Sequence, residues 1–259
     1  MPPTPGIIAS LLPADLSAFA LAIFLVGTFV AAFVTGLSGF AFGMVAAAIW
    51  LHALDPLQGS TLIVAYALMV QGYAVWKLRR SIMPGRLAPF VIGTAVGLPA
   101  GLAALNWVPP LYLRIGIGAL MIAFSLYNLL RPSVPLVKNA GRGADATVGV
   151  LNGVVGGATG LAGIMPMMWS GLRGWTRDEQ RAVFQPTAVA TFVMMIGALG
   201  GTGLVTAATA KLFVLGVPAL AAGTCLGWIL YGRLDEATFR KVVLALLLVS
   251  GVALVSLGR

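Results

Sequence analysis

The feature that most limits the fold of this chain is the distribution of its charges, which leaves eight long stretches empty. None of these stretches contains Asp, Glu, Lys or Arg; they cover residues 16–51, 56–76, 87–113, 115–130, 146–172, 182–210, 212–232 and 242–258. A helix needs about 20 apolar residues to cross a bilayer, within a range of roughly 17–25. A membrane β-barrel would instead show short segments of alternating polarity. The sequence therefore predicts an all-α integral membrane protein with eight hydrophobic segments.

The overall composition agrees with this class. Charged residues make up 9% of the chain and hydrophobic residues 59%, whereas a soluble domain carries about 25% charged residues. We assign the net charge of +9 to membrane topology rather than to nucleic-acid binding, because Lys and Arg in short loops mark the cytoplasmic side. The single cysteine, Cys225, excludes an intramolecular disulfide. Residues 1–15 lack the basic start of a cleaved signal peptide.

Two glycine-rich stretches interrupt the apolar segments. The first, GLSGFAFG, occupies residues 36–43, and the second, NGVVGGATGLAG, occupies residues 152–163. Each glycine costs a helix roughly 1 kcal/mol relative to Ala. Glycine also permits sharp breaks and a close approach of backbone to backbone or to a ligand. We therefore expect a broken helix at each stretch.

The two halves of the chain resemble each other. GLSGFAFG at 36–43 aligns with GVVGGATG at 153–160, and Ser60-Thr61 aligns with Pro186-Thr187 at a shift of 126 residues. The same shift places Gly97 on Gly223 and Gly101 on Gly227. We interpret this as an internal duplication of four segments. It divides the chain into an N-terminal extension (1–15), a first repeat (16–130), a linker loop (131–145) and a second repeat (146–259).

The basic residues predict opposite orientations for the two repeats. Loop 77–86 carries four Lys or Arg residues, whereas its counterpart in the second repeat, 201–211, carries one. The bias is reversed in the next pair: loop 106–110 carries none and its counterpart 231–241 carries three. Equivalent loops then lie on opposite sides of the membrane, which defines an inverted repeat. Inversion needs an odd number of membrane crossings in each repeat. With four segments per repeat, one must enter and leave the membrane on the same side. The first segment of each repeat is therefore expected to be a Gly-broken re-entrant hairpin. The loops expected in the cytoplasm, with both termini outside, are 77–86, 131–145, 170–181 and 231–241.

Three motifs resemble the sulfite exporter TauE/SafE family: GLSGFAFGMVA (36–46), GGATGLAGIMP (156–166) and GWTRDEQRAVFQP (174–186). The duplicated four-segment layout resembles that family too, over nearly the whole chain. The resemblance implies a multi-pass protein of the cell inner (plasma) membrane that exports sulfite, organosulfonates or related organic acids. The family often has a proline soon after the glycine cluster in both halves. Pro166 fits this pattern in the second half, but Ile49 stands at the aligned place in the first.

The chemistry of anion transport points to the same two stretches. No Lys or Arg lies in the middle of a segment, so we expect helix N-termini, each with about half a positive charge, to replace a counter-ion. The candidate N-termini follow Gly43, Gly160, Gln58 and Gln185. The predicted substrate-binding residues lie beside them: Ser38, Gly39, Gly43, Ser60, Thr61, Asn152, Gly156, Thr159, Gly160, Gln185 and Thr187. Gln71 is a further candidate, and all these polar groups equally suit helix caps or bonds between helices.

Two other functions fit some of the residues. Gly36-Leu37-Ser38-Gly39 matches the GxSG motif of rhomboid-like intramembrane serine proteases, but the base that such a Ser38 needs exists only as His52 in a loop. One His, one Cys and no mid-span carboxylate argue against a metal site. The sequence does not decide between a transporter and a simple anion channel, nor does it decide whether the chain forms a homodimer. We expect no enzyme activity, no cofactor and no nucleic-acid partner; the expected partners are a small anion and the lipid bilayer.

Overall fold

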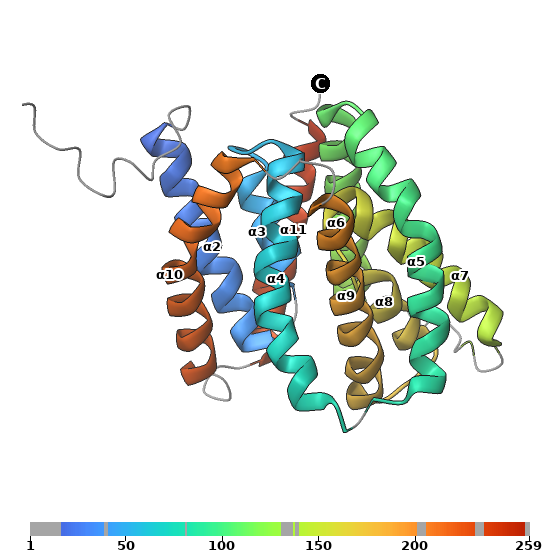
Figure 1. The fold of residues 1–259 in the computed structure, drawn as a ribbon. Coiled ribbons are helices and arrows are strands. Elements are labelled where there is room, and N and C mark those ends of the chain that lie inside the picture. Colours follow the sequence, from blue (N-terminus) through green and yellow to red (C-terminus); the bar gives the residue numbers. More distant parts are fainter. Residues whose placement is uncertain are drawn as a thin grey trace, which may run out of the picture.

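Helices account for all regular secondary structure in the described part of the chain. The computed structural model describes residues 17–38, 41–80, 82–130, 137, 140–200, 206–230 and 236–256. Within these residues ten helices form one bundle (Figure 1). In chain order they are α2 (Ala18–Ser38), α3 (Phe42–Trp50), α4 (Pro56–Leu78), α5 (Pro84–Trp107), α6 (Pro110–Leu130), α7 (Arg142–Thr159), α8 (Ile164–Leu172), α9 (Arg177–Gly200), α10 (Ala207–Leu230) and α11 (Glu236–Ser256).

The lengths of the helices identify a multi-pass membrane protein. Among the described residues, six helices are long and apolar enough to span a membrane: α2, α4, α5, α6, α9 and α10. Helices α3 and α8 have nine residues each. At 1.5 Å per residue they cover roughly 14 Å, about half of the 30 Å hydrocarbon layer. The predicted all-helical membrane class is confirmed, whereas the count of eight segments stays a prediction.

Both glycine-rich stretches break the helix, as the sequence predicts. Helix α2 ends at Ser38 and α3 begins at Phe42; α7 ends at Thr159 and α8 begins at Ile164. In the second break Gly160 has φ 74° and Gly163 has φ 86°, a left-handed conformation that residues with a Cβ rarely adopt. The candidate Gly39 and the side chain of Ser38 lie outside the described residues.

The start of α9 corrects one prediction. The sequence predicts a helix N-terminus after Gln185, but the helix begins at Arg177. Thr176 and Glu179 form a capping box: the Thr176 N–H donates to Glu179 Oε2 at 2.9 Å, and the Glu179 N–H donates to Thr176 Oγ1 at 3.4 Å. Gln185 and Thr187 therefore lie inside the helix. Similarly, the last residues of the predicted linker, 142–145, form the first turn of α7.

Glycines bring α5 and α7 into backbone contact. A Cβ added to Gly97 of α5 would lie 2.1 Å from the Val150 carbonyl oxygen, and one added to Gly153 of α7 would lie 2.3 Å from that of Thr94. Contacts proceed in the same direction along both helices, from Gly93 against Ala146 to Gly101 against Val154. Helices α5 and α7 are therefore parallel and in register. Such small-residue contacts are typical of helix pairs in lipid.

Helices α2 and α10 form a second pair of the same kind. A Cβ added to Gly223 would lie 2.4 Å from the Phe29 carbonyl oxygen, and one added to Gly227 would lie 2.6 Å from that of Phe33. These contacts also run in the same direction along both helices. Figure 1 shows the pair α2–α10 and the pair α5–α7 on opposite flanks of the bundle, with α4 and α9 between them.

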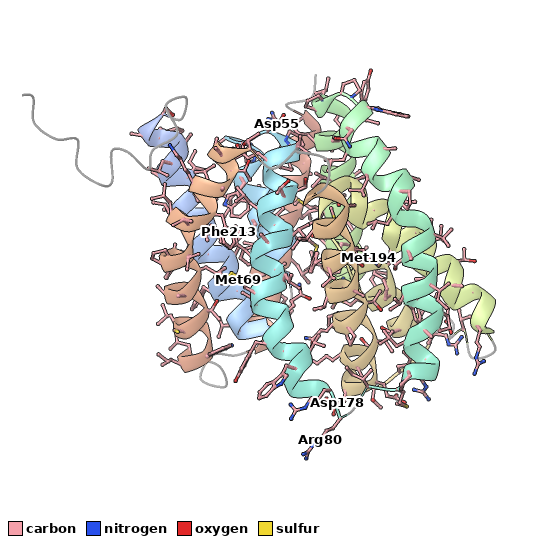
Figure 2. The ribbon with its side chains drawn as sticks, in the orientation of Figure 1. Asp55, Met69, Arg80, Asp178, Met194 and Phe213 are labelled. Atoms are coloured by element: carbon pink, nitrogen blue, oxygen red, sulfur yellow. The ribbon has the colours of Figure 1, made fainter. Side chains whose placement is uncertain are left out.

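Helices α4 and α9 contact each other and run in opposite directions. Figure 2 shows Asp55, just before α4, at the upper end of the bundle, and Arg80, just after α4, at the lower end together with Asp178 of α9. At the lower end Arg86 forms an ion pair with Glu179 at 2.7 Å, and Arg173 donates to the Ala140 carbonyl. Three of the loops predicted to be cytoplasmic therefore meet at one end. The side of the membrane that this end faces stays a prediction.

The glycine contacts give a first testable prediction. Gly153→Ala should lower the free energy of unfolding by about 1–3 kcal/mol or prevent folding, because the added methyl group overpacks the α5–α7 contact. Gly116→Ala on α6 is the matched control, because a Cβ there meets nothing within 4 Å and Ala favours a helix by roughly 1 kcal/mol. The measurement is thermal unfolding of both variants in detergent. Equal melting temperatures would contradict the proposed role of this contact.

Candidate functional site

Asn152 holds the second helix break in place. Its Oδ1 accepts a hydrogen bond from the Gly163 N–H at 2.7 Å. Its Nδ2 donates to the hydroxyl oxygens of Thr94 and Thr191, each at 3.2 Å. Asn152 is buried, and these bonds use both donors of its amide. One side chain thus ties the break to α5 through Thr94 and to α9 through Thr191.

At the other end of the same break, Thr159 forms hydrogen bonds with the backbone. Its hydroxyl donates to the Val155 carbonyl at 2.6 Å and accepts from the Leu161 N–H at 3.1 Å. The Gly160 N–H donates to the Gly156 carbonyl at 2.7 Å. Irregular backbone at membrane depth is tolerated only where its polar groups find partners or line a cavity. Asn152 and Thr159 are therefore structural residues of the break.

Aromatic packing surrounds α3, the helix that follows the first break. Ala41, which precedes α3, adopts φ 79° and ψ 3°, a strained conformation for a residue with a Cβ. The Trp50 indole N–H at the other end of α3 donates to the Phe24 carbonyl at 3.2 Å. The Trp50 ring lies 5.1 Å from that of Phe24, 6.2 Å from that of Phe42 and 6.0 Å from that of Tyr66, between centroids. This cluster fixes α3 to α2 and α4.

The two breaks meet in the middle of the bundle. A Cβ added to Gly43 would lie 2.9 Å from Leu161 Cδ2 and 3.8 Å from the Gly160 carbonyl oxygen. A cavity of about 30 Å³ lies between the first turns of α3 and α8, roughly twice the space that one water needs. Its lining residues are Ala41, Phe42, Gly43, Met44, Gln71, Gly160, Leu161, Ala162, Gly163, Ile164, Met167, Phe184 and Phe192.

This cavity offers hydrogen-bond donors and no lining charge. Neither α3 nor α8 has a side-chain cap, and their first internal bonds are donated by the N–H groups of Val45 and Met167. The earlier N–H groups of each helix therefore have no acceptor within it. Gln71 of α4 is 8% exposed, and its side chain bonds to no other residue that the structure describes. The arrangement suits an anion, which helix N-termini bind through free N–H groups and their partial positive charge.

The predicted site residues divide between the cavity and its supports. Gly43 and Gly160 line the cavity. A Cβ added to Gly160 would lie 3.0 Å from the Ser60 carbonyl oxygen, so Ser60 packs directly behind the break. The hydroxyls of Ser60 and Thr61 both donate to the Leu57 carbonyl, at 3.0 and 2.8 Å. These two hydroxyls are engaged within the first turns of α4.

The remaining candidates lie around the break rather than in the cavity. Gly156 packs against Thr191 and Ala162, since an added Cβ would lie 3.0 and 3.5 Å from them. Thr187 donates to the Val183 carbonyl at 2.7 Å, and Gln185 is buried in α9. Sequence reasoning missed the apolar lining of the cavity, because nothing distinguishes Phe184 from other apolar residues of the same helix. The signal that did point to the cavity is Gln71, an isolated amide in an apolar segment.

These observations define a multi-pass helical membrane protein with a small cavity at two helix breaks. The sulfite exporter TauE/SafE family model matches residues 23–254. The chain therefore belongs to this family, and the resemblance of the three sequence motifs is confirmed. No curated protein and no solved structure gives a match. The family consists of membrane transporters, which fits the expectation that the chain is not an enzyme.

A second prediction concerns Asn152. Asn152→Ala should lower the free energy of unfolding by about 1–3 kcal/mol, the cost of leaving the buried Gly163 N–H unsatisfied. Asn106→Ala is the control, because Asn106 is exposed and its side chain bonds, among the residues that the structure describes, only to the Leu102 carbonyl of its own helix. Such surface changes alter the free energy of unfolding by no more than about 0.5 kcal/mol. Thermal unfolding in detergent compares the two. The role assigned to Asn152 is wrong if both variants melt like the original chain.

Proposed function

We propose that this chain is a secondary transporter that exports small anions such as sulfite, organosulfonates or related organic acids. The observation that carries the proposal is that the uncapped N-termini of α3 and α8 meet at one small cavity beside Gln71. Each N-terminus is equivalent to about half a positive charge. The two together balance roughly one negative charge, and Gln71 adds an oriented donor. Membership of the TauE/SafE family supports the same class of substrate.

We further propose that the two halves are inverted repeats that begin with re-entrant hairpins, α2–α3 and α7–α8. Three observations support this: α3 and α8 are both nine residues long, the pairs α2–α10 and α5–α7 correspond, and α4 and α9 are antiparallel (Figure 2). In inverted repeats the substrate site lies near the membrane midplane at the repeat interface. Rocking one half against the other exposes such a site to each side in turn.

The shape of the cavity favours a transporter over a channel. Its volume is about 30 Å³ and its lining includes Phe42, Phe184 and Phe192, whereas a channel needs a continuous conducting path. The protease alternative has less support, because Ser38 ends α2 while His52 is exposed in the turn after α3. The family resemblance and the basic loops together support placement in the cell inner (plasma) membrane.

The positions of the acidic residues suggest how export is driven. Proton-coupled transporters place Asp, Glu or His at membrane depth, but here these residues occur at segment ends or in loops: Asp15, His52, Asp55, Asp145, Asp178, Glu179, Asp235 and Glu236. A membrane potential of about 100 mV, negative inside, favours loss of one negative charge by ~2.3 kcal/mol. That energy sustains a roughly 40–50-fold ratio of anion concentration between the two sides of the membrane. We propose that the potential drives export.

A third prediction tests the cavity. Gln71→Leu should lower the rate of sulfite export about tenfold or more, because a hydrogen bond to a charged group contributes roughly 1.5–3 kcal/mol. Gln58→Leu, at the start of the same helix and outside the cavity lining, should leave export near its original rate. The measurement is sulfite efflux from proteoliposomes containing equal amounts of each variant. Equal rates for both variants would place the substrate elsewhere.

A fourth prediction tests the driving force. Efflux of a fully ionised sulfonate should rise as the interior of the proteoliposome is made more negative with potassium and valinomycin. An imposed pH gradient should change this efflux little, since no titratable residue is proposed to take part. Protein-free liposomes are the control for leakage. Flux that follows the pH gradient and ignores the potential would refute potential-driven export.

A further inference from the structure

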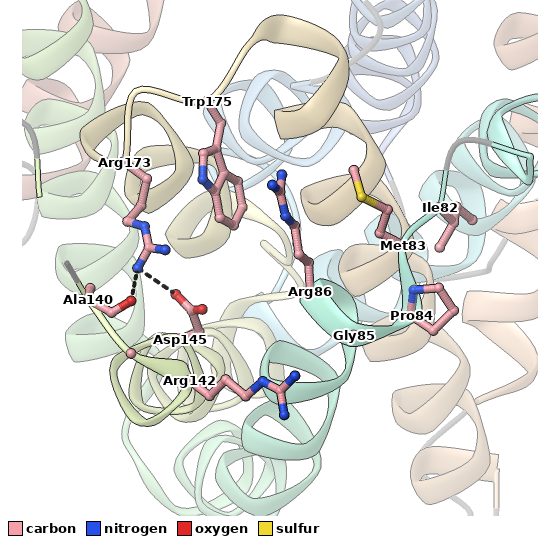
Figure 3. A pocket seen from close by; sticks show the side chains of 11 residues that line it. Ile82, Met83, Pro84, Gly85, Arg86, Ala140, Arg142, Asp145, Arg173 and Trp175 are labelled. Carbon is pink, nitrogen blue, oxygen red and sulfur yellow. Dashed lines mark hydrogen bonds and ion pairs between the residues drawn. The ribbon is translucent and has the colours of Figure 1, made fainter. Parts of the chain in front are cut away.

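A second and much larger cavity, the arginine pocket, lies at the lower end of the bundle. Its volume is about 650 Å³, against about 30 Å³ for the cavity at the breaks. It lies between the N-termini of α5 and α7 and the segment after α8 (Figure 3). The lining residues are Ile82, Met83, Pro84, Gly85, Arg86, Ala140, Gly141, Arg142, Asp145, Arg173 and Trp175.

The parallel packing of α5 and α7 brings two positive helix ends together in this pocket. Gly93 packs against Ala146, so Arg86 and Arg142, each in the first turn of its helix, lie within about one helical turn of each other along the pair. Neither N-terminus has a side-chain cap. Anionic groups stabilise helix N-termini and cationic groups oppose them. Two arginines at adjacent helix N-termini therefore add positive charge to two positive dipole ends. Asp145 in the first turn of α7 and Glu179 beside Arg86 offset part of this charge, and a bound anion would offset more.

Two of the three arginines are held in position. Arg173 lies 3.7 Å from Asp145 Oδ1 and donates to the Ala140 carbonyl, while the Trp169 indole N–H donates to the same Asp145 oxygen at 2.7 Å. Arg86 pairs with Glu179. The guanidinium carbons of Arg86 and Arg173 lie 5.3 and 5.5 Å from the centroid of the Trp175 ring, and Figure 3 shows both beside it.

The lining retains a positive excess. It contains three arginines and one aspartate, and the aspartate, Asp145, is 7% exposed and engaged with Arg173 and Trp169. Arg142 is exposed and forms no ion pair with any other described residue. Its guanidinium, together with the first N–H groups of α7, is available to an anionic ligand.

We propose that the arginine pocket binds the phosphate headgroup of an anionic phospholipid. The candidate membrane span of α5 begins at Pro84, which places the pocket where headgroups lie. Ile82, Met83 and Pro84 give it an apolar wall, with Met83 43% exposed, suited to the start of an acyl chain. A small inorganic anion would fill little of the pocket. Basic pockets at helix ends are a recognised form of lipid site. The proposal is independent of the transported substrate.

The test is native mass spectrometry of the full chain in detergent, titrated with phosphatidylglycerol or phosphatidylcholine. The original chain should bind phosphatidylglycerol more tightly. Arg142→Gln should weaken that binding about fivefold, the factor implied by loss of one basic contact near the membrane surface. Arg142→Lys should retain most of it. Arg79→Gln is the matched control, since Arg79 is exposed, follows α4 and lies outside the pocket lining; it should bind like the original chain.

Three results would overturn the proposal. The first is equal affinity for the two lipids, and the second is an equal loss in Arg142→Gln and Arg79→Gln, which would indicate general surface charge. The third is displacement of the lipid by free inorganic phosphate or sulfite at concentrations where chloride has no effect, which would make the pocket a site for soluble anions. Gln71→Leu should bind phosphatidylglycerol normally, so failure of the transport proposal is distinguishable from failure of this one.

Discussion

The backbone contact between α5 and α7 is the interaction on which the candidate site depends. Lipid tails provide no hydrophobic drive for helices to associate, so close packing of small residues and bonds between helices must do so. Thr94 lies between Gly93 and Gly97 on α5, and Asn152 lies beside Gly153 on α7. Only at this close approach does the short threonine hydroxyl reach Asn152 Nδ2, at 3.2 Å. That bond orients the amide so that its oxygen accepts the Gly163 N–H.

Among the residues of the first break that the structure describes, this arrangement is not repeated, although α2 packs on α10 through Gly223 and Gly227. At the shift of 117 residues that aligns the two breaks, Asn152 corresponds to Thr35. The Thr35 hydroxyl donates to the Ala31 carbonyl at 2.7 Å, within its own helix. The aromatic cluster around Trp50 holds α3 instead. The second break is thus tied by the hydrogen bonds of Asn152, whereas the described contacts of α3 combine ring packing with the hydrogen bond from the Trp50 indole to the Phe24 carbonyl.

The sequence predicted the membrane class and both breaks, because these depend on the absence of charge and on clusters of glycine. Helix α9 begins before its apolar run because Thr176 and Glu179, which have the spacing of a capping box, start it. The site was predicted only in part. A sequence does not tell whether a hydroxyl such as that of Thr61 or Thr187 bonds within its own helix or faces a cavity. Only the packing of distant helices decides this.

Helix dipoles act at both cavities, but their consequences differ. At the lower end, water can solvate the three arginines, so full charges can reinforce the N-termini of α5 and α7. At the breaks a full charge would carry a large desolvation cost, and the N-termini of α3 and α8 provide partial charges that need no separate hydration. A site built from backbone dipoles has no group that titrates, so its attraction for an anion depends on the charge and shape of the anion alone. That property suits a carrier that must bind an anion and also release it, because half-charges hold an ion less firmly than an arginine would.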